Sequence, residues 1–303
     1  MRLARFNRHA EVPSLARLGV VVPSDTVADL RAGYAAFLHE RGDGQAIEVA
    51  AIRVPGTLSA LIASNALARS ELVDVVAWLG ETAAADAQAQ GLRGEPLFTP
   101  LAECRLHAPI RLTNLFVANG NYGAASPAIT MKPSIAVVGP SRDIRLPTDI
   151  TAISCAPGLA VVMGQGCRDV AECDAGDVIA GYFVMTNVSA ATRGGTQSFE
   201  AGMYETFAPS GPWLVTNDDV GNAMDLRVEM RVDGELWRQF STASMTWPIN
   251  RLIAFLSRMT LQPGDVIWSG AADGAPAEPS IRLGNQVESI VDRVGRIRNR
   301  VVR

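Results

Sequence analysis

Hydrophobic and polar positions divide the chain into two parts with different patterns. In residues 1–99, short apolar runs are typical of strands, and apolar positions three or four apart are typical of helices. Strands are predicted at 2–6 and 18–22, and helices are predicted at 26–40, 59–68 and 70–90. Two glycines and two prolines in 91–100 indicate a linker. We therefore expect a small α/β accessory domain over residues 1–99.

From residue 101 onward, β-rich runs recur between turn signals. Strands are predicted at 115–118, 135–138, 159–163, 213–216, 226–232, 266–268 and 286–291. Amphipathic helices are predicted at 167–176 and 247–258, the second with apolar positions on one face. Many short strands with few helices favour an α+β chain whose residues 100–303 form a mixed β-roll or barrel.

Composition and charge narrow the functional classes. The chain has 303 residues, 27 basic and 31 acidic, and a formal net charge of −4. This balance argues against a nucleic-acid partner or a membrane partner, because no excess of cations exists to neutralise phosphates. No run approaches the roughly 18 apolar residues of a membrane span, and the basic start lacks the apolar core of a signal peptide. We expect a soluble cytoplasmic protein.

Cysteine and histidine residues do not have metal-site spacing. They stand at Cys104, Cys155, Cys167, Cys173, His9, His39 and His107. A zinc site needs at least three clustered soft ligands, and these residues are scattered. We expect four reduced thiols that are mostly buried.

The sequence from Pro100 to the end resembles the fumarylacetoacetate hydrolase (FAH) superfamily in eight segments, which occur in the same order as in the family. They include MKPSIAVVGPSRDIRLP, GLAVVMGQGCRDV, DVIAGYFVMTNVSAATR and SMTWPINRLIAFLSRMTLQPGDVIWSGAADG. The resemblance implies an FAH-like C-terminal β-roll, a variable N-terminal domain, a homodimer and chemistry on small 2-oxo or 1,3-diketo acids. Members hold a divalent cation with three carboxylates, and hydrolytic members add a His–Glu pair that activates water.

The sequence departs from that pattern at all three metal ligands and at the His–Glu pair, whereas Lys132 and Tyr122 are retained. The Glu-x-Glu ligand pair of the family corresponds to Ala156 and Gly158, and the third ligand to Asn187. The His–Glu pair corresponds to Ala125 and Ala128. A neutral amide cannot hold a divalent ion alone, so we interpret the chain as a divergent member with no metal and no cofactor.

The frame of the family places other polar residues near the pocket. Candidate catalytic residues are Lys132, Tyr122 and Glu205; candidate substrate-binding residues are Asn121, Asn187, Ser189, Arg193 and Ser269. Lys132, the only lysine, serves as an acid, a Schiff-base nucleophile or a carboxylate anchor, or is an ordinary loop lysine. Glu205 is a new base or the partner of an arginine. Tyr122 and Asn121 orient substrate or cap a strand.

Three functions stay open from the sequence. The first is a metal-free C–C hydrolase, lyase or isomerase-type enzyme acting on a small organic acid or an enolisable ketone. The second is a catalytically inactive protein that binds a ligand or supports an active paralogue. The third uses Cys155 as a nucleophile, which needs a nearby histidine or other cation, and His107 is the only central histidine.

Overall fold

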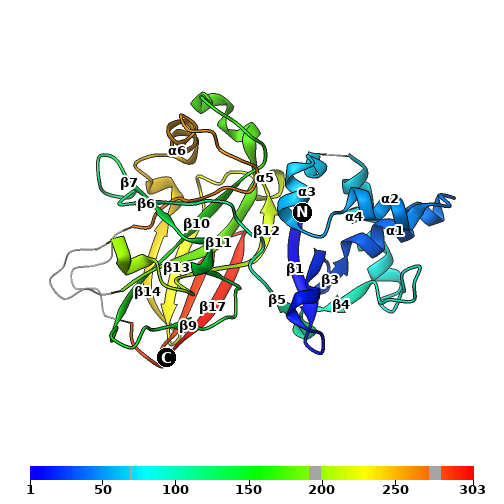
Figure 1. Ribbon diagram of the computed structural model, residues 1–303, viewed down its shortest axis with the longest axis horizontal. Helices are drawn as coiled ribbons and strands as arrows, with labels where there is room; N and C mark the ends of the chain where they lie inside the picture. Colours follow the sequence, from blue (N-terminus) through cyan, green and yellow to red (C-terminus); the bar gives the residue numbers. More distant parts are fainter. Residues whose placement is uncertain (69, 191–198, 273–280) are drawn as a thin grey trace.

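A large mixed sheet and a smaller one form the framework in the computed structural model, which describes residues 1–68, 70–190, 199–272 and 281–303 (Figure 1). The large sheet has the order β4-β3-β2-β1-β12-β11-β10-β15-β6-β7, with β5 beside β1 and β8 beside β12. Its strands are β1 (Arg2–Arg8), β2 (Arg17–Val22), β3 (Thr26–Asp29), β4 (Phe98–Pro100), β5 (Cys104–Leu106), β6 (Leu115–Asn119), β7 (Ala128–Lys132), β8 (Val137–Val138), β10 (Ile153–Met163), β11 (Ile179–Ala190), β12 (Ala208–Thr216) and β15 (Val266–Trp268).

The smaller sheet has the order β14-β13-β16-β17-β9. Its strands are β9 (Ile144–Arg145), β13 (Arg227–Val232), β14 (Glu235–Ser241), β16 (Gln286–Val291) and β17 (Gly295–Val302). Asp233 and Gly234, both at positive φ, make the tight turn between β13 and β14. The predicted α+β class is confirmed, and the described strands form open sheets and no closed barrel.

Helices cover both ends of the large sheet (Figure 1). The α-helices are α1 (Leu30–Glu40), α2 (Ala46–Arg53), α3 (Leu58–Ala63), α4 (Ser70–Ala85), α5 (Asn217–Val220) and α6 (Ile249–Leu256). The 3-10 helices are η1 (Pro13–Leu15), η2 (Ala66–Ala68), η3 (Leu101–Glu103), η4 (Ser134–Ala136), η5 (Glu172–Val178), η6 (Phe199–Gly202) and η7 (Thr242–Ser244). None of the described helices combines the length and apolarity needed to cross a bilayer.

Several predicted boundaries were wrong for local physical reasons. The helix predicted over 26–40 begins at Leu30, because Asp29 accepts the Ala32 N–H as an N-cap and the β-branched residues before it pair with β2. The predicted helices over 59–68 and 70–90 end at Ala63 and Ala85.

Three other segments differ in type from the prediction. The helix predicted over 167–176 is only the 3-10 helix η5, and the strand predicted over 135–138 is η4 followed by the two residues of β8. The segment read as a linker ends in β4, which pairs with β3. In contrast, α6 buries Ile249, Leu252, Ile253 and Leu256 as its apolar spacing predicts.

The N-terminal residues share a sheet and a core with the rest of the chain. β1 pairs with β12, with Arg2 opposite Val215. A single buried cluster includes Leu3 from β1, Leu79 from α4 and Trp268 from β15. Residue 99, where the predicted accessory domain ends, lies inside β4, and β1 joins the two parts of the chain through its pairing with β12. The division into two domains stays a prediction.

All four cysteines are free thiols. Cys104 and Cys155 are buried, Cys167 is half-buried and Cys173 is exposed.

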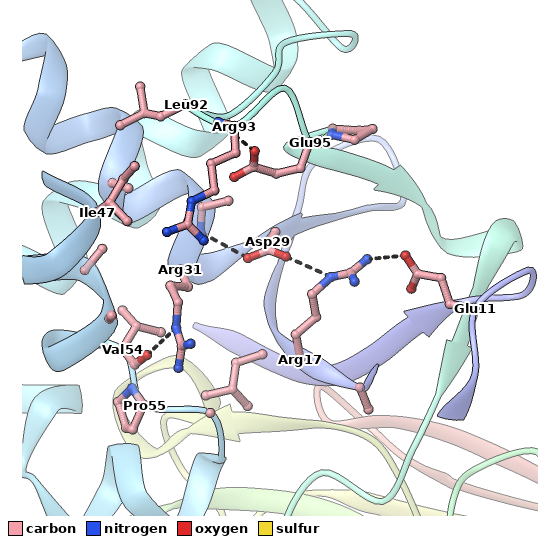
Figure 2. Close-up of a pocket in the computed structure, with 18 of the residues that line it drawn as sticks. Glu11, Arg17, Asp29, Arg31, Ile47, Val54, Pro55, Leu92, Arg93 and Glu95 are labelled. Atoms are coloured by element: carbon pink, nitrogen blue, oxygen red, sulfur yellow. Dashed lines mark hydrogen bonds and ion pairs between the residues drawn. The ribbon is translucent and has the colours of Figure 1, made fainter. Parts of the chain in front are cut away.

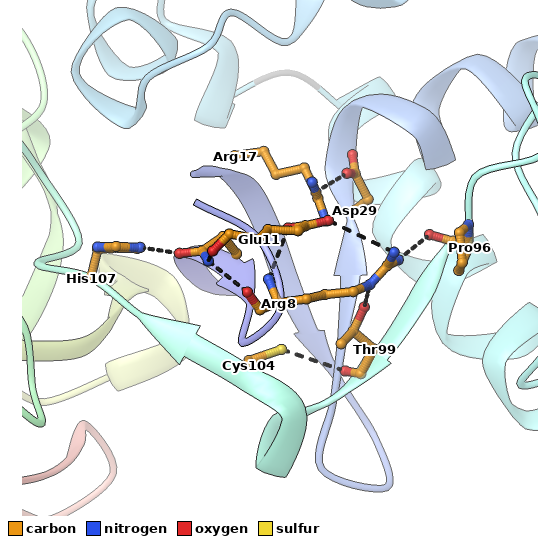
Figure 3. Close-up of polar contacts among 9 residues, drawn as sticks. Arg8, Glu11, Arg17, Asp29, Pro96, Thr99, Cys104 and His107 are labelled. Atoms are coloured by element: carbon orange, nitrogen blue, oxygen red, sulfur yellow. Dashed lines mark hydrogen bonds and ion pairs between the residues drawn. The ribbon is translucent and has the colours of Figure 1, made fainter. Parts of the chain in front are cut away.

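His107 fastens the chain beside β5 to the N-terminal strand (Figure 3). Its backbone N–H donates to Arg5 O at 2.9 Å, and its Nε2 lies 2.5 Å from Asn7 Oδ1. Burial and the neighbouring arginines Arg5, Arg105 and Arg142 lower the pKa of His107 to about 4. The neutral ring is therefore the form that the fold stabilises.

Lowering the pH should weaken the fold through this histidine. Between about pH 6.5 and 4 the unfolded chain protonates His107 while the folded chain does not, so the free energy of unfolding falls with falling pH. Urea denaturation of His107→Gln should show a shallower fall over this range than the parent, whereas exposed His39→Gln should follow the parent. Identical curves for His107→Gln and the parent would contradict this role.

Candidate functional site

The long antiparallel pair β10–β11 positions a cavity. Ser154 lies opposite Ser189, and Ala156 lies opposite Asn187. Because alternate residues of a strand share a face, these four residues are presented together on one face of the sheet. β11 is a near-continuous apolar run and is buried along most of its length, as expected for a strand covered on both faces.

A cavity of about 390 Å³ opens over these residues. It is lined by Asn119, Gly120, Ser154, Ala156, Asn187, Ser189, Arg238, Trp268, Ala271 and Ala272. Amides, hydroxyls, an indole and one guanidinium supply its side-chain polarity. In the described part of the chain, Arg238 is the one charged group in this lining. The described lining therefore presents one cationic group beside uncharged hydrogen-bonding groups.

Arg238 enters the cavity from β14. It shares a strand face with Phe240, which stacks edge-on against Tyr122 with ring centroids 4.9 Å apart. Its Nη1 lies 3.4 Å from the carbonyl oxygen of Ala272, and its side chain is half-buried. Sequence reasoning missed this residue. The available signal was a single cation that alternates with Leu236 and Phe240 directly after the Asp233-Gly234 turn signal.

Asn187 and Ser189 are the predicted binding residues that do line the cavity. Asn187 is 8% exposed, and its Oδ1 is buried without a hydrogen-bond partner among the described residues. Leaving such an acceptor buried and unpaired costs free energy.

Trp268 takes the space beside Gly158. A Cβ at residue 158 would lie 2.5 Å from Trp268 Nε1 and 2.7 Å from Gly270 O. A glutamate therefore does not fit at this position without displacement of backbone. The lining offers no carboxylate, and no cluster of three His, Cys, Asp or Glu side chains exists among the described residues. These residues do not fit a divalent cation, which prefers anionic oxygen ligands.

The contact between Gly158 and Trp268 is testable by stability. Gly158→Ala should lower the free energy of unfolding by roughly 1–3 kcal/mol, because the added methyl overlaps the indole and a backbone oxygen. Gly176→Ala is the control, since nothing lies within 4 Å of a Cβ at that glycine. Urea denaturation that gives equal midpoints for the two variants would show that the site relaxes around a larger residue.

Lys132 lies outside the cavity lining, where its buried side chain hydrogen-bonds to two backbone carbonyls. It ends β7, is 8% exposed, and its Nζ donates to Val188 O at 2.6 Å and to Phe207 O at 2.9 Å. Burial lowers the pKa of Lys132 to about 7, with a smaller opposing effect of Cys155. A neutral amine has two N–H donors, and the two carbonyl oxygens accept both.

Asn121 ties three segments together. It is fully buried; its Nδ2 donates to Trp247 O and Ser269 O, and its Oδ1 accepts the Trp247 N–H at 2.9 Å. Tyr122 and Ser269 have buried hydroxyls without a hydrogen-bond partner among the described residues. Burial raises the pKa of Tyr122. These three residues pack outside the cavity lining.

The remaining candidates lie elsewhere. Glu205 is exposed and is not among the lining residues, so its role as a base stays a prediction. Arg193 falls outside the described residues. Burial raises the pKa of Cys155 to about 12, so its thiol is protonated at neutral pH, and His107 is engaged with Asn7. A Cys155 nucleophile therefore has no activating partner in this arrangement.

Comparisons with known proteins place this architecture in one family. Residues 117–302, more than half of the chain, match the family described as fumarylacetoacetate (FAA) hydrolase C-terminal. Protein Rv2993c of Mycobacterium tuberculosis is 34% identical over 227 residues, which cover 69% of this chain and 84% of that protein. A relative from Burkholderia multivorans, whose name provisionally assigns a hydrolase, is 36% identical over 56% of this chain and 63% of its own length.

Solved structures of enzymes resemble this chain over its full length. Maleylpyruvate hydrolase from Sphingobium sp. SYK-6 is 28% identical, with a TM-score of 0.74 and coverage of 100% of this chain and 99% of that one. The same enzyme has also been solved in complex with manganese (II) ion and pyruvate. 5-Carboxymethyl-2-hydroxymuconate delta-isomerase from Mycobacterium smegmatis is 25% identical, with a TM-score of 0.69 and full coverage of both chains. The chain belongs to the fumarylacetoacetate hydrolase superfamily.

Proposed function

We propose that this protein binds a small 2-oxo or enolisable carboxylic acid without a metal ion and catalyses its keto–enol tautomerisation, an isomerase-type reaction. The single observation that carries the proposal is the lining of the β10–β11 cavity: Arg238 beside uncharged hydrogen-bonding groups, and no carboxylate among the described residues. The similarity to an isomerase and to an enzyme solved with pyruvate supports a ligand of this class.

Each group has a distinct part in this scheme. The Arg238 guanidinium binds the substrate carboxylate, for which its planar donor pair is suited. Asn187 lines the cavity, and its Nδ2 group donates to the oxygen that becomes negative in the enolate. Donors fixed in advance stabilise developing charge without reorganisation, so they lower the barrier to proton loss at the adjacent carbon.

Tautomerisation suits this lining better than hydrolysis does. Hydrolysis of a carbon–carbon bond needs a base to activate water. Arg238 is the one ionisable side chain among the described lining residues, and because an arginine stays protonated, it cannot act as that base. Tautomerisation also needs a proton acceptor, and because the described lining holds no side-chain base, a solvent water takes the proton from the substrate carbon while solvent protonates the enolate oxygen. It needs no activated water as a nucleophile, which hydrolysis does. The same observation favours the second candidate, a non-catalytic protein that binds this ligand or supports an active paralogue.

Deuterium exchange separates these possibilities. NMR would follow exchange at the carbon beside the keto group of 2-oxobutanoate, in D₂O with excess EDTA. Exchange faster than in enzyme-free buffer is the expected result. Ligand binding without accelerated exchange would support the binding protein instead. Neither binding nor exchange would overturn the assignment of this cavity to 2-oxo acids.

We also propose a cytoplasmic homodimer, as the composition and the resemblance to the family indicate. Light scattering coupled to size-exclusion chromatography should give twice the chain mass. The mass of a monomer would contradict the proposed homodimer.

A further inference from the structure

A second cavity, of about 530 Å³, lies among the N-terminal elements (Figure 2). α1 contributes Ala32 and Ala35 to its walls, and the α2 segment contributes Ile47, Ala50 and Val54. It shares no lining residue with the β10–β11 cavity. Its volume lies within the range of roughly 300–1,000 Å³ that is typical of small-molecule sites.

One side of this cavity is closed by charges that already neutralise one another. Arg17 Nε lies 2.8 Å from Asp29 Oδ2, and Arg17 Nη2 lies 3.1 Å from Glu11 Oε1 (Figures 2 and 3). Asp29 also caps α1 through the Ala32 N–H. Arg8 joins the same network through Glu11, with Nη1 to Oε1 at 3.9 Å. These groups are structural and need no ligand.

Arg31 is different. Its Nε donates to Val54 O at 2.8 Å, which fixes the guanidinium at the cavity, and no ion pair of Arg31 exists among the described residues. Figure 2 shows its terminal nitrogens directed away from the Asp29 ion pair. Gly56 leaves room beside them, since a Cβ there would still lie 3.7 Å from Arg31 Nη2. An exposed guanidinium that is held through Nε, and whose two terminal nitrogens have no ion pair among the described residues, is available to a carboxylate.

The charges of the whole lining agree with an anionic occupant. The lining contains four arginines and three carboxylates, namely Arg8, Arg17, Arg31, Arg93, Glu11, Asp29 and Glu95. The formal balance is one positive charge in excess. Apart from Arg31, the residues that α1 and the α2 segment contribute to the lining are apolar, so the occupant needs an apolar body as well as an anionic head.

We propose that this cavity is a binding site for a small amphipathic carboxylate, whose head pairs with Arg31 and whose apolar body contacts α1 and α2. The site is independent of the tautomerase assignment, because it uses other residues in another part of the fold.

Binding of 4-phenylbutanoate, with its neutral amide as the matched ligand, tests the site by calorimetry. The acid should bind at least about tenfold more tightly than 4-phenylbutanamide, and Arg31→Gln should remove that preference. Arg53→Gln, at the end of α2 and outside the lining, should bind as the parent does. Ala51→Phe, at an exposed lining position, should weaken both ligands.

Circular dichroism would confirm that each variant is folded. No binding of the acid, equal affinity for acid and amide, or an unchanged affinity in Arg31→Gln would overturn the proposal. Displacement of 4-phenylbutanoate by oxalate would place the ligand in the β10–β11 cavity and would also overturn it.

Discussion

Replacing Arg238 with methionine should weaken the binding of oxalate by about 10- to 100-fold, because the carboxylate loses a charged hydrogen-bond donor in a partly enclosed cavity. Oxalate is a planar dianion that resembles the enolate of a 2-oxo acid. Methionine keeps an unbranched side chain of comparable reach, so the loss reports on charge and donors more than on volume. Calorimetric titration in excess EDTA measures the effect.

Two further variants make this result specific. Arg238→Lys should recover part of the affinity, because an ammonium supplies the charge but not the paired donors of a guanidinium. Arg298→Met, at an exposed position of β17, should bind oxalate as the parent does. An Arg238→Met protein with parental affinity would show that the carboxylate binds elsewhere.

Replacing Lys132 with methionine should cost roughly 1–3 kcal/mol of stability at neutral pH, because it removes the two donors that Val188 O and Phe207 O accept. Methionine fills a similar volume, which limits any cavity effect. The same variant should alter oxalate affinity less than Arg238→Met does, since Lys132 lies outside the lining. Urea denaturation measures the stability difference.

The pH dependence of that difference has a definite sign. Burial lowers the pKa of Lys132 in the folded chain to about 7, whereas an unfolded lysine titrates near 10.4. Between these values the unfolded state binds more protons, so the stability of the parent should rise with pH from about 7 to 10. Lys132→Met should lack this contribution.

A direct check uses the fact that the chain has one lysine. Selective ¹³C labelling of lysine gives a single Cε resonance, whose titration reports Lys132 alone. A midpoint near that of free lysine, or parallel stability curves for the parent and Lys132→Met, would show that the buried amine stays charged.

The sequence predicted those features that depend on local pattern. The apolar face of α6 and the alternation in β1 and β16 are visible in the order of residues, and the family resemblance placed Asn187 and Ser189 at the cavity. The boundary between β3 and α1 was not visible, because pairing with β2 overrides a helical spacing that continues through Val27.

The rest of the site depends on contacts between distant segments. Trp268 fills the space beside Gly158 across more than a hundred residues, and Arg238 reaches the cavity only because β14 folds back against β13. Lys132 was expected near the pocket, yet two backbone carbonyls hold it outside the lining. Residue types alone carry no information about such packing, so these roles required the structure.

The most direct test of metal-free recognition is the affinity of the parent protein for oxalate, measured once in excess EDTA and once with saturating Mn²⁺ in place of the chelator. If Arg238 and Asn187 bind oxalate without a metal ion, the dissociation constant of the oxalate complex should be the same under both conditions, after correction for the oxalate that Mn²⁺ binds in solution. Binding that appears only with Mn²⁺, or that tightens tenfold or more, would contradict the account and would place a metal ion between the protein and its ligand.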